Sequence, residues 1–341
     1  MTALPATRPA DRRLPPQSCS ARWDDGDLPA WGTASQAAFW LALEQPGPWG
    51  RNALTASRLD PALGAELEQR TARAGGRTLL IRKPGSSADA PVHDGHRASR
   101  PRRIYLAVGM PQGSPLLLTG EIDDPAELLR LPWRELAEGH APTAPLGLVA
   151  RLRPQRLGVL LVCTNAKRDR CCAFRGLPLA ARLHEAVPDR VWECTHTGGH
   201  RFAPTGVGLP SGLTLARLDE PTGRELLDSP AGTLPDSLRD ATHLRGLAHL
   251  PAVLQAADAY ARARWDVADL RASTGASLQP GDPRHRPDHQ VVAVHPPAPH
   301  ARKRLLAVRT RTDPVDRPAS CGADLGPSQF YDVEPLDDQG V

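Results

Sequence analysis

The chain of 341 residues, with 40% hydrophobic and 23% charged residues, has the composition of an ordinary soluble globular protein, and its length suits about two domains. This composition excludes collagen-like, coiled-coil and disulfide-scaffold proteins. The formal net charge of +4 is too small to indicate nucleic acid as a partner, and no apolar run is long enough to span a bilayer.

The six cysteines are clustered rather than spread along the chain. The first 22 residues lack the apolar stretch of a secretory signal, so we expect a cytoplasmic protein with reduced thiols. In that setting clustered cysteines more often bind a metal or act in catalysis than form disulfides. The cysteines are Cys19, Cys163, Cys171, Cys172, Cys194 and Cys321.

In chain order, residues 1–30 are rich in proline and poor in large apolar residues, and we expect them to be poorly ordered. A helix is predicted over 60–76, because Asp60 suits a cap and proline suits the first helical position. The segment 125–139 is predicted to be helical with a break at Pro132. The run 38–45 fits a buried strand or a short helix, and strands are predicted at 77–83, 102–109 and 114–122.

The second half repeats this order. A strand at 156–163 leads into a loop that holds the cysteine cluster, and helices are predicted at 177–187 and 244–265. Further strands are predicted at 190–195, 205–210 and 213–218, the last two as a hairpin. We expect residues 275–289 to be a linker, and 289–296 with 303–311 to form a C-terminal hairpin.

The element order of each half is that of a thioredoxin-like unit. We therefore predict an α/β protein of two tandem thioredoxin-like units plus a C-terminal β-hairpin extension. The expected divisions are a poorly ordered segment at 1–30, a unit without cysteines at 31–150, a unit carrying the cysteine cluster at 151–274, and a linker with the β extension at 275–341.

Two blocks in the second half combine metal-binding residue types. Eight residues separate Cys163 from Cys172 in "CTNAKRDRCC", and three separate His196 from His200 in "HTGGH". Loops that follow parallel strands lie at the same end of a sheet, so we expect the two pairs to converge. The intervening glycines suit a loop whose backbone approaches a bound group closely. The joint pattern predicts a metal site.

Two cysteines and two histidines are compatible with Zn²⁺, but structural zinc sites usually pair cysteines about two to four residues apart. The longer spacer favours a larger group. A [2Fe–2S] cluster has that size, and two histidines can replace two cysteines on one of its irons. Because the cysteines and histidines stand in separate blocks, a Rieske domain is excluded.

These motifs resemble those of the sucrase/ferredoxin-like family of thioredoxin-like ferredoxins. The resemblance rests on "VCTNAKRDRCCAFRG", "ECTHTGGHRFAPTGVGLPSG" and, in the first half, "LEQPGPWGRNAL" with "LLIRKPG". The chain departs from it at Asn165 and Ala166, where many members have a His-Gly pair. The resemblance implies a [2Fe–2S] electron-transfer protein whose ligands are Cys163, Cys172, His196 and His200.

Further properties follow from this resemblance. With two thiolates the oxidised cluster is neutral, so its potential should exceed that of plant-type ferredoxins, and proton loss from a ligating imidazole should make it pH-dependent. Gly198 and Gly199 are expected to offer backbone N–H groups to sulfur. The Ala203–Pro204 peptide bond is expected to be cis, because Ala-Pro-Thr precedes the third strand as in thioredoxin-like proteins.

Other residues around the predicted site have less specific roles. Cys171 and Cys194 are expected beside the cluster rather than as ligands. Basic residues, among them Lys167 and Arg170, form either a solvated loop or a docking surface for an acidic redox partner protein. No pair of carboxylates suits the glycosidase chemistry that the word sucrase implies, so an electron carrier is favoured over an enzyme.

Two alternatives stay open. The first is a zinc-stabilised structural or interaction module. The second is a thiol–disulfide oxidoreductase using Cys171 or Cys172, although the Cys-x-x-Cys expected at a helix start is absent.

Overall fold

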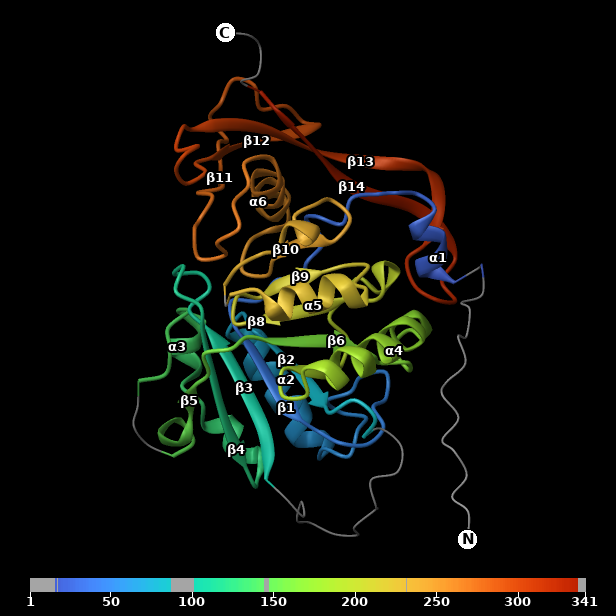
Figure 1. Cartoon of the computed structure of the whole chain (residues 1–341), viewed down its shortest axis with the longest axis vertical. Helices are drawn as coiled ribbons and strands as arrows, with labels where there is room; N and C mark the ends of the chain where they lie inside the picture. Colours follow the sequence, from blue (N-terminus) through green and yellow to red (C-terminus); the bar gives the residue numbers. More distant parts are fainter. Residues whose placement is uncertain (1–15, 17, 87–100, 144–146, 231, 337–341) are drawn as a thin grey trace.

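The computed structural model describes residue 16 and residues 18–86, 101–143, 147–230 and 232–336. It is a mixed α/β structure with a large sheet of ten strands and a separate antiparallel sheet of four (Figure 1). The strand order of the large sheet is β10-β9-β8-β6-β7-β2-β1-β3-β4-β5.

The first half of the chain forms one side of the large sheet. β1 and β2 are parallel, β3 pairs antiparallel with β1, and β4 pairs antiparallel with β3. The short β5 lies at the outer edge, beside β4. These strands are β1 (Trp40–Glu44), β2 (Arg77–Arg82), β3 (Arg102–Val108), β4 (Leu116–Ile122) and β5 (Arg153–Pro154).

The second half forms the other side with the same arrangement. β6 and β7 are parallel, β8 pairs antiparallel with β6, and β9 pairs antiparallel with β8, followed by β10. The predicted strands of both halves are therefore confirmed in type and order. They are β6 (Val159–Cys163), β7 (Val191–Cys194), β8 (Gly206–Leu209), β9 (Leu213–Leu215) and β10 (Leu244–Leu247).

The two halves join through β2 and β7, which pair antiparallel over Ile81–Cys194 and Arg82–Glu193. One buried apolar cluster spans this junction and includes Leu43 and Ile81 from the first half with Leu161 from the second. The halves therefore share a sheet and a core.

The helices confirm some predictions and correct others. Asp60 caps α2 by accepting a hydrogen bond from Leu63 N at 2.8 Å, with Pro61 at its first position. The segment 125–139 divides at Pro132 into a 3-10 helix and α3, as expected. The helices are α1 (Cys19–Asp24), α2 (Pro61–Arg73), α3 (Trp133–Ala137), α4 (Arg170–Ala186), α5 (Glu220–Asp228) and α6 (Ala252–Arg264), with 3-10 helices at Pro125–Arg130, Val149–Arg151, His200–Phe202 and Asp236–Leu238.

Three predictions of local structure are wrong. The helix expected at 177–187 begins at Arg170, so Cys171 and Cys172 lie in its first turn and not in a loop. The single helix expected at 244–265 is β10 followed by α6, with Pro251 as the cap of α6. The prediction of poor order for residues 1–30 does not hold for α1, and residues 1–15 and 17 lie outside the described residues.

The C-terminal extension is larger than the predicted hairpin. β12 and β13 form that hairpin, but a long β14 adds to β13 and a short β11 adds to β12 within the segment expected to be a linker. The apolar face of this sheet covers α6. The strands are β11 (Ser277–Leu278), β12 (His289–Val294), β13 (Arg304–Pro318) and β14 (Leu325–Pro335).

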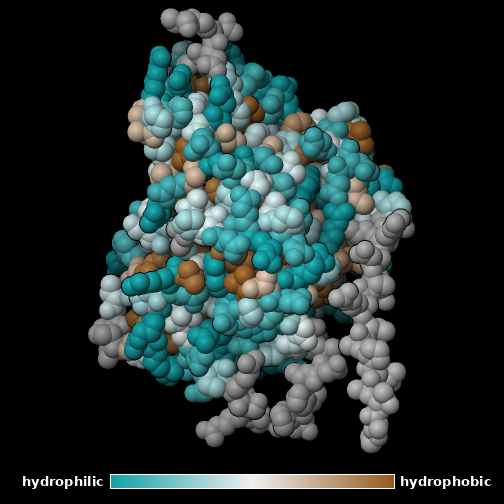
Figure 2. All heavy atoms as spheres, viewed as in Figure 1, coloured by the Kyte–Doolittle hydropathy of each residue, from teal (hydrophilic) through white to brown (hydrophobic). Residues whose placement is uncertain are grey.

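The far end of the β13–β14 hairpin lies beside α1, although the two come from opposite ends of the chain (Figure 1). Trp23 Nε1 donates a hydrogen bond to Pro318 O at 3.1 Å, and Arg317 Nε donates one to Arg22 O at 3.0 Å. No helix among the described residues is both long and apolar enough to cross a membrane. The face drawn in Figure 2 is mainly hydrophilic, with scattered hydrophobic residues.

Candidate metal centre

The parallel strands β6 and β7 place the first two thiols side by side. Cys163 ends β6, Cys194 ends β7, and the two are partners in the strand register. Both side chains are fully buried. The loops that follow these strands therefore start at the same end of the sheet, as the sequence predicts.

The first turn of α4 brings two more thiols to this end of the sheet. Asp169 caps the helix by accepting a hydrogen bond from Cys171 N at 2.9 Å, and Cys171 and Cys172 follow on the first turn, both buried. Gly176 lies against β6, where a Cβ atom would overlap the Cys163 carbonyl oxygen. A glycine at this position thus permits the close approach of α4 to Cys163.

The two histidines stand on a turn built by consecutive glycines. Gly198 and Gly199 both have left-handed backbone angles, with φ of 84° and 68°. A Cβ on Gly199 would lie 2.5 Å from an Arg245 guanidinium nitrogen, so the turn has no room for a side chain there. Arg245 is fully buried and donates a hydrogen bond to Gly198 O at 2.9 Å. The sequence gives no local signal for this arginine, which lies 47 residues away.

These segments assemble a cysteine–histidine group, which we define as Cys163, Cys172, His196 and His200. One ligand atom from each of the first three lies within 4.8 Å of the others. His196 Nδ1 is 4.0 Å from Cys163 Sγ, and its Nε2 is 3.3 Å from His200 Nδ1. The four residues predicted to converge are brought together, with the thiols buried and the two rings partly exposed.

The two thiols of this group have opposite electrostatic character. The Cys172 thiol donates to Cys163, which lowers the pKa of Cys163 well below its usual range, and His196 favours the same thiolate. Two effects raise the pKa of Cys172: its hydrogen bond to Cys163, and its burial. Burial lowers the pKa of His200, although the Asp169 carboxylate opposes this. These contacts therefore favour the thiolate form of Cys163 and the neutral form of His200.

A second cluster, which we call the three-thiol group, consists of Cys19, Cys171 and Cys321 with the carboxylate of Asp169. The Sγ–Sγ distances are 3.4 Å from Cys19 to Cys171, 3.6 Å from Cys19 to Cys321 and 3.1 Å from Cys171 to Cys321. Cys19 donates to Cys171, and this lowers the pKa of Cys171 to about 5. All six cysteines are free thiols. No sequence motif joins these residues, because Cys19 and Cys321 are 302 positions apart.

Asp169 connects the two groups. Its Oδ2 is 3.7 Å from His200 Nε2, and the same carboxylate lies within 3.8 Å of Cys19 Sγ. An Asp directly before a helical segment is a typical cap, so Asp169 is the sequence signal for a helix that starts at Arg170.

The remaining predicted residues lie around the cysteine–histidine group. Cys194 is buried next to Cys163, in the apolar cluster rather than in either group. Lys167 and Arg170 are exposed at the rim. The Ala203–Pro204 peptide bond is cis, as predicted. The expected N–H donation from Gly198 and Gly199 to sulfur stays a prediction.

A family model described as sucrase/ferredoxin-like matches residues 30–239. The match contains the whole cysteine–histidine group, whereas Cys19 and Cys321 lie outside it. No curated protein and no solved structure matched the chain.

Proposed function

Because the chain belongs to the sucrase/ferredoxin-like family, we propose that it holds one [2Fe–2S] cluster and transfers electrons to or from a partner protein. The proposed ligands are Cys163, Cys172, His196 and His200. The observation that carries the proposal is their convergence from three separate elements: the end of β6, the first turn of α4 and the glycine turn after β7.

The four ligand side chains fit a [2Fe–2S] cluster. Two thiolates and two imidazoles are the ligands that a [2Fe–2S] cluster takes when two histidines replace two cysteines on one iron. The lowered pKa of Cys163 favours the thiolate that binds iron. When bound, the cluster would supply a site that accepts and releases one electron.

The surrounding residues orient the ligands and limit access of water. Arg245 holds the Gly198 carbonyl, and Ser35 Oγ donates to Thr197 O at 3.1 Å, which together define the histidine turn. The backbone N–H groups at the start of α4 favour negative charge, and they oppose the effects of Cys163 and of burial that raise the pKa of Cys172. Because the thiols are buried and the histidine rings are partly exposed, the histidine side would face an electron-transfer partner.

Two broader features complete the proposal. The strand order β2-β1-β3-β4 of the first half repeats as β7-β6-β8-β9 in the second, and this repeat supports our proposal that both halves are thioredoxin-like units. The exposed Lys167 and Arg170 suit an acidic partner, and six free thiols suit a reducing, cytoplasmic setting.

The test is the metal content and colour of protein purified without oxygen. We expect about two iron and two acid-labile sulfide per chain, with visible absorption and, after reduction, an electron paramagnetic resonance signal. Cys172→Ser should remove the iron. The matched control Cys194→Ala changes a buried thiol outside the ligand set and should retain it.

Iron-free protein whose zinc is lost in Cys172→Ser would instead support the zinc-module alternative. Retention of full iron content by Cys172→Ser would reject the ligand set. The oxidoreductase alternative requires dithiol turnover that depends on Cys171 or Cys172 and persists without iron.

A further inference from the structure

The three-thiol group joins three segments that are distant in the sequence. Cys19 lies in α1, Cys171 in the first turn of α4, and Cys321 between β13 and β14. Cys19 and Cys321 are 302 positions apart. We propose that this group is a second metal site, which binds one Zn²⁺ ion through the three thiolates and the Asp169 carboxylate.

The distances suit a single tetrahedral ion. With Zn–S bonds of about 2.3 Å and a Zn–O bond of about 2.0 Å, tetrahedral geometry separates the sulfurs by about 3.8 Å and places the oxygen about 3.5 Å from each sulfur. The sulfurs are 3.1, 3.4 and 3.6 Å apart. The Asp169 oxygens are 3.8 and 3.7 Å from Cys19 Sγ.

Other uses of three thiols fit less well. A disulfide requires an S–S distance of about 2.05 Å and would leave one thiol without a partner. In an iron–sulfur cluster, thiolates on different irons are held apart by the cluster itself, whereas these three sulfurs surround one point. Three thiolates with one carboxylate are ligands that zinc accepts.

The proposed zinc ligands are held in place by the surrounding backbone and are mostly buried. Asp169 is held by hydrogen bonds from Cys171 N at 2.9 Å and Cys321 N at 2.8 Å, so both oxygens are oriented while each keeps a lone pair. Cys19, Cys171 and Asp169 are buried, and Cys321 is partly exposed, which leaves an entry path for the ion.

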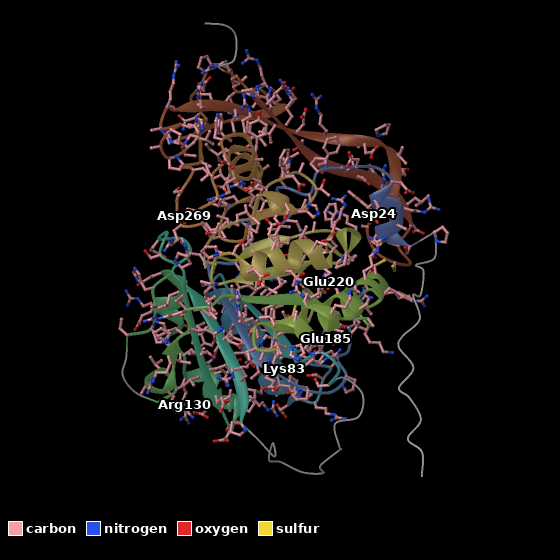
Figure 3. The ribbon with its side chains drawn as sticks, viewed as in Figure 1. Asp24, Lys83, Arg130, Glu185, Glu220 and Asp269 are labelled. Carbon is pink, nitrogen blue, oxygen red and sulfur yellow. The ribbon has the colours of Figure 1, made fainter. Side chains whose placement is uncertain are left out.

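Neighbouring contacts hold the same segments together. Asp24 of α1, labelled in Figure 3, forms an ion pair with Arg175 of α4 at 2.6 Å. Trp23 of α1 donates to Pro318 at the end of β13. A zinc ion here would fasten both flanking segments to α4. Because Cys19 and Cys321 lie outside residues 30–239, this site is an addition to the family match, and it shares no ligand with the proposed cluster.

The experiment measures zinc and iron separately in the full chain and its variants. Wild-type protein grown with zinc should contain about one zinc per chain. Cys321→Ser, at a partly exposed turn, should lose most of that zinc and keep its iron and visible spectrum. Cys163→Ser should lose iron and keep zinc, and Cys194→Ala should keep both. Loss of zinc binding and loss of the iron cluster can therefore be detected separately.

A second measurement covers the case in which Cys321→Ser does not fold. The Cys163→Ser variant is stripped with a chelator and titrated with Co²⁺, and thiolate-to-cobalt absorption should saturate at one equivalent. Absence of zinc with no cobalt band, zinc retained in Cys321→Ser, or an intact mass lower by two hydrogens that marks a disulfide would each overturn the proposal.

Discussion

At the scale of single residues, two consecutive glycines decide where the histidines stand. Gly198 and Gly199 adopt left-handed angles, and Arg245 fills the space on which a side chain at position 199 would project. The turn is therefore specified by backbone conformation and by close packing together.

We predict that Gly199→Ala destabilises the fold and reduces iron content. A left-handed alanine costs about 1–2 kcal/mol, and displacement of the buried Arg245 adds to this. Gly85→Ala is the matched control, because Gly85 has φ of 82° and a Cβ there would have no other atom within 4 Å. Urea unfolding should show a larger loss for Gly199→Ala, and equal losses would contradict the packing argument.

The sequence predicted some of these residues and not others. Cys163, Cys172, His196 and His200 were predictable because their spacing lies within two short motifs at the ends of neighbouring strands. Arg245 was not, because its contact with Gly198 arises only when β10 is added to the sheet.

At the scale of elements, α4 determines the separation of Cys172 from Cys163. Helix and strand approach closely because Gly176 has no side chain to place against the Cys163 carbonyl. The sequence misplaced the start of this helix at 177, because Pro178 is typical of a first turn. In the structure Pro178 lies inside α4, and Asp169 provides the cap.

We predict that Gly176→Ala lowers both stability and iron content. Alanine normally stabilises a helix by about 1 kcal/mol relative to glycine, but overlap with backbone in a packed core costs about 1–3 kcal/mol. Gly64→Ala in α2 is the control, since its Cβ would overlap the Leu54 carbonyl away from the thiols. Gly64→Ala should reduce the free energy of unfolding while leaving the iron content unchanged. An unchanged iron content in Gly176→Ala would show that the close approach of α4 does not determine the separation of Cys172 from Cys163 that iron binding needs.

At the scale of the whole molecule, a buried ion pair lies where the halves meet. Arg82 of β2 and Glu193 of β7 are 2.7 Å apart, with side-chain exposures of 8% and 2%. Thr164 Oγ1 donates to the same carboxylate at 3.0 Å, and Arg82 donates to Gly47 O at 2.9 Å. The pair therefore connects the junction of the halves to the loop that follows Cys163.

We predict that Glu193→Gln destabilises the protein by about 3–5 kcal/mol, because it leaves the Arg82 charge buried without its counter-charge. The double variant Arg82→Met/Glu193→Leu should recover most of that loss. Glu138→Gln breaks the exposed pair with Arg134, and should cost less than about 1 kcal/mol. The measurement is the urea-unfolding free energy, and a loss in Glu193→Gln no larger than in Glu138→Gln would contradict the prediction.

The sequence predicted the repeated strand order, because each half carries its own apolar runs in the same succession. It did not predict that the halves share one sheet, since the β2–β7 pairing involves only two residue pairs without a motif. It also missed β14, because the strand Leu325–Pro335 is mostly exposed or half-buried and is stabilised by its pairing with β13 rather than by an apolar run.

Cys171 and Cys172 are consecutive residues on one helical turn, yet each belongs to a different thiol group. A shift or rotation of that turn moves both thiols at once. Ligands that bind at both groups would therefore be thermodynamically linked: if occupation of one group orders the turn, it raises affinity at the other, and the coupling free energy is the same in both directions.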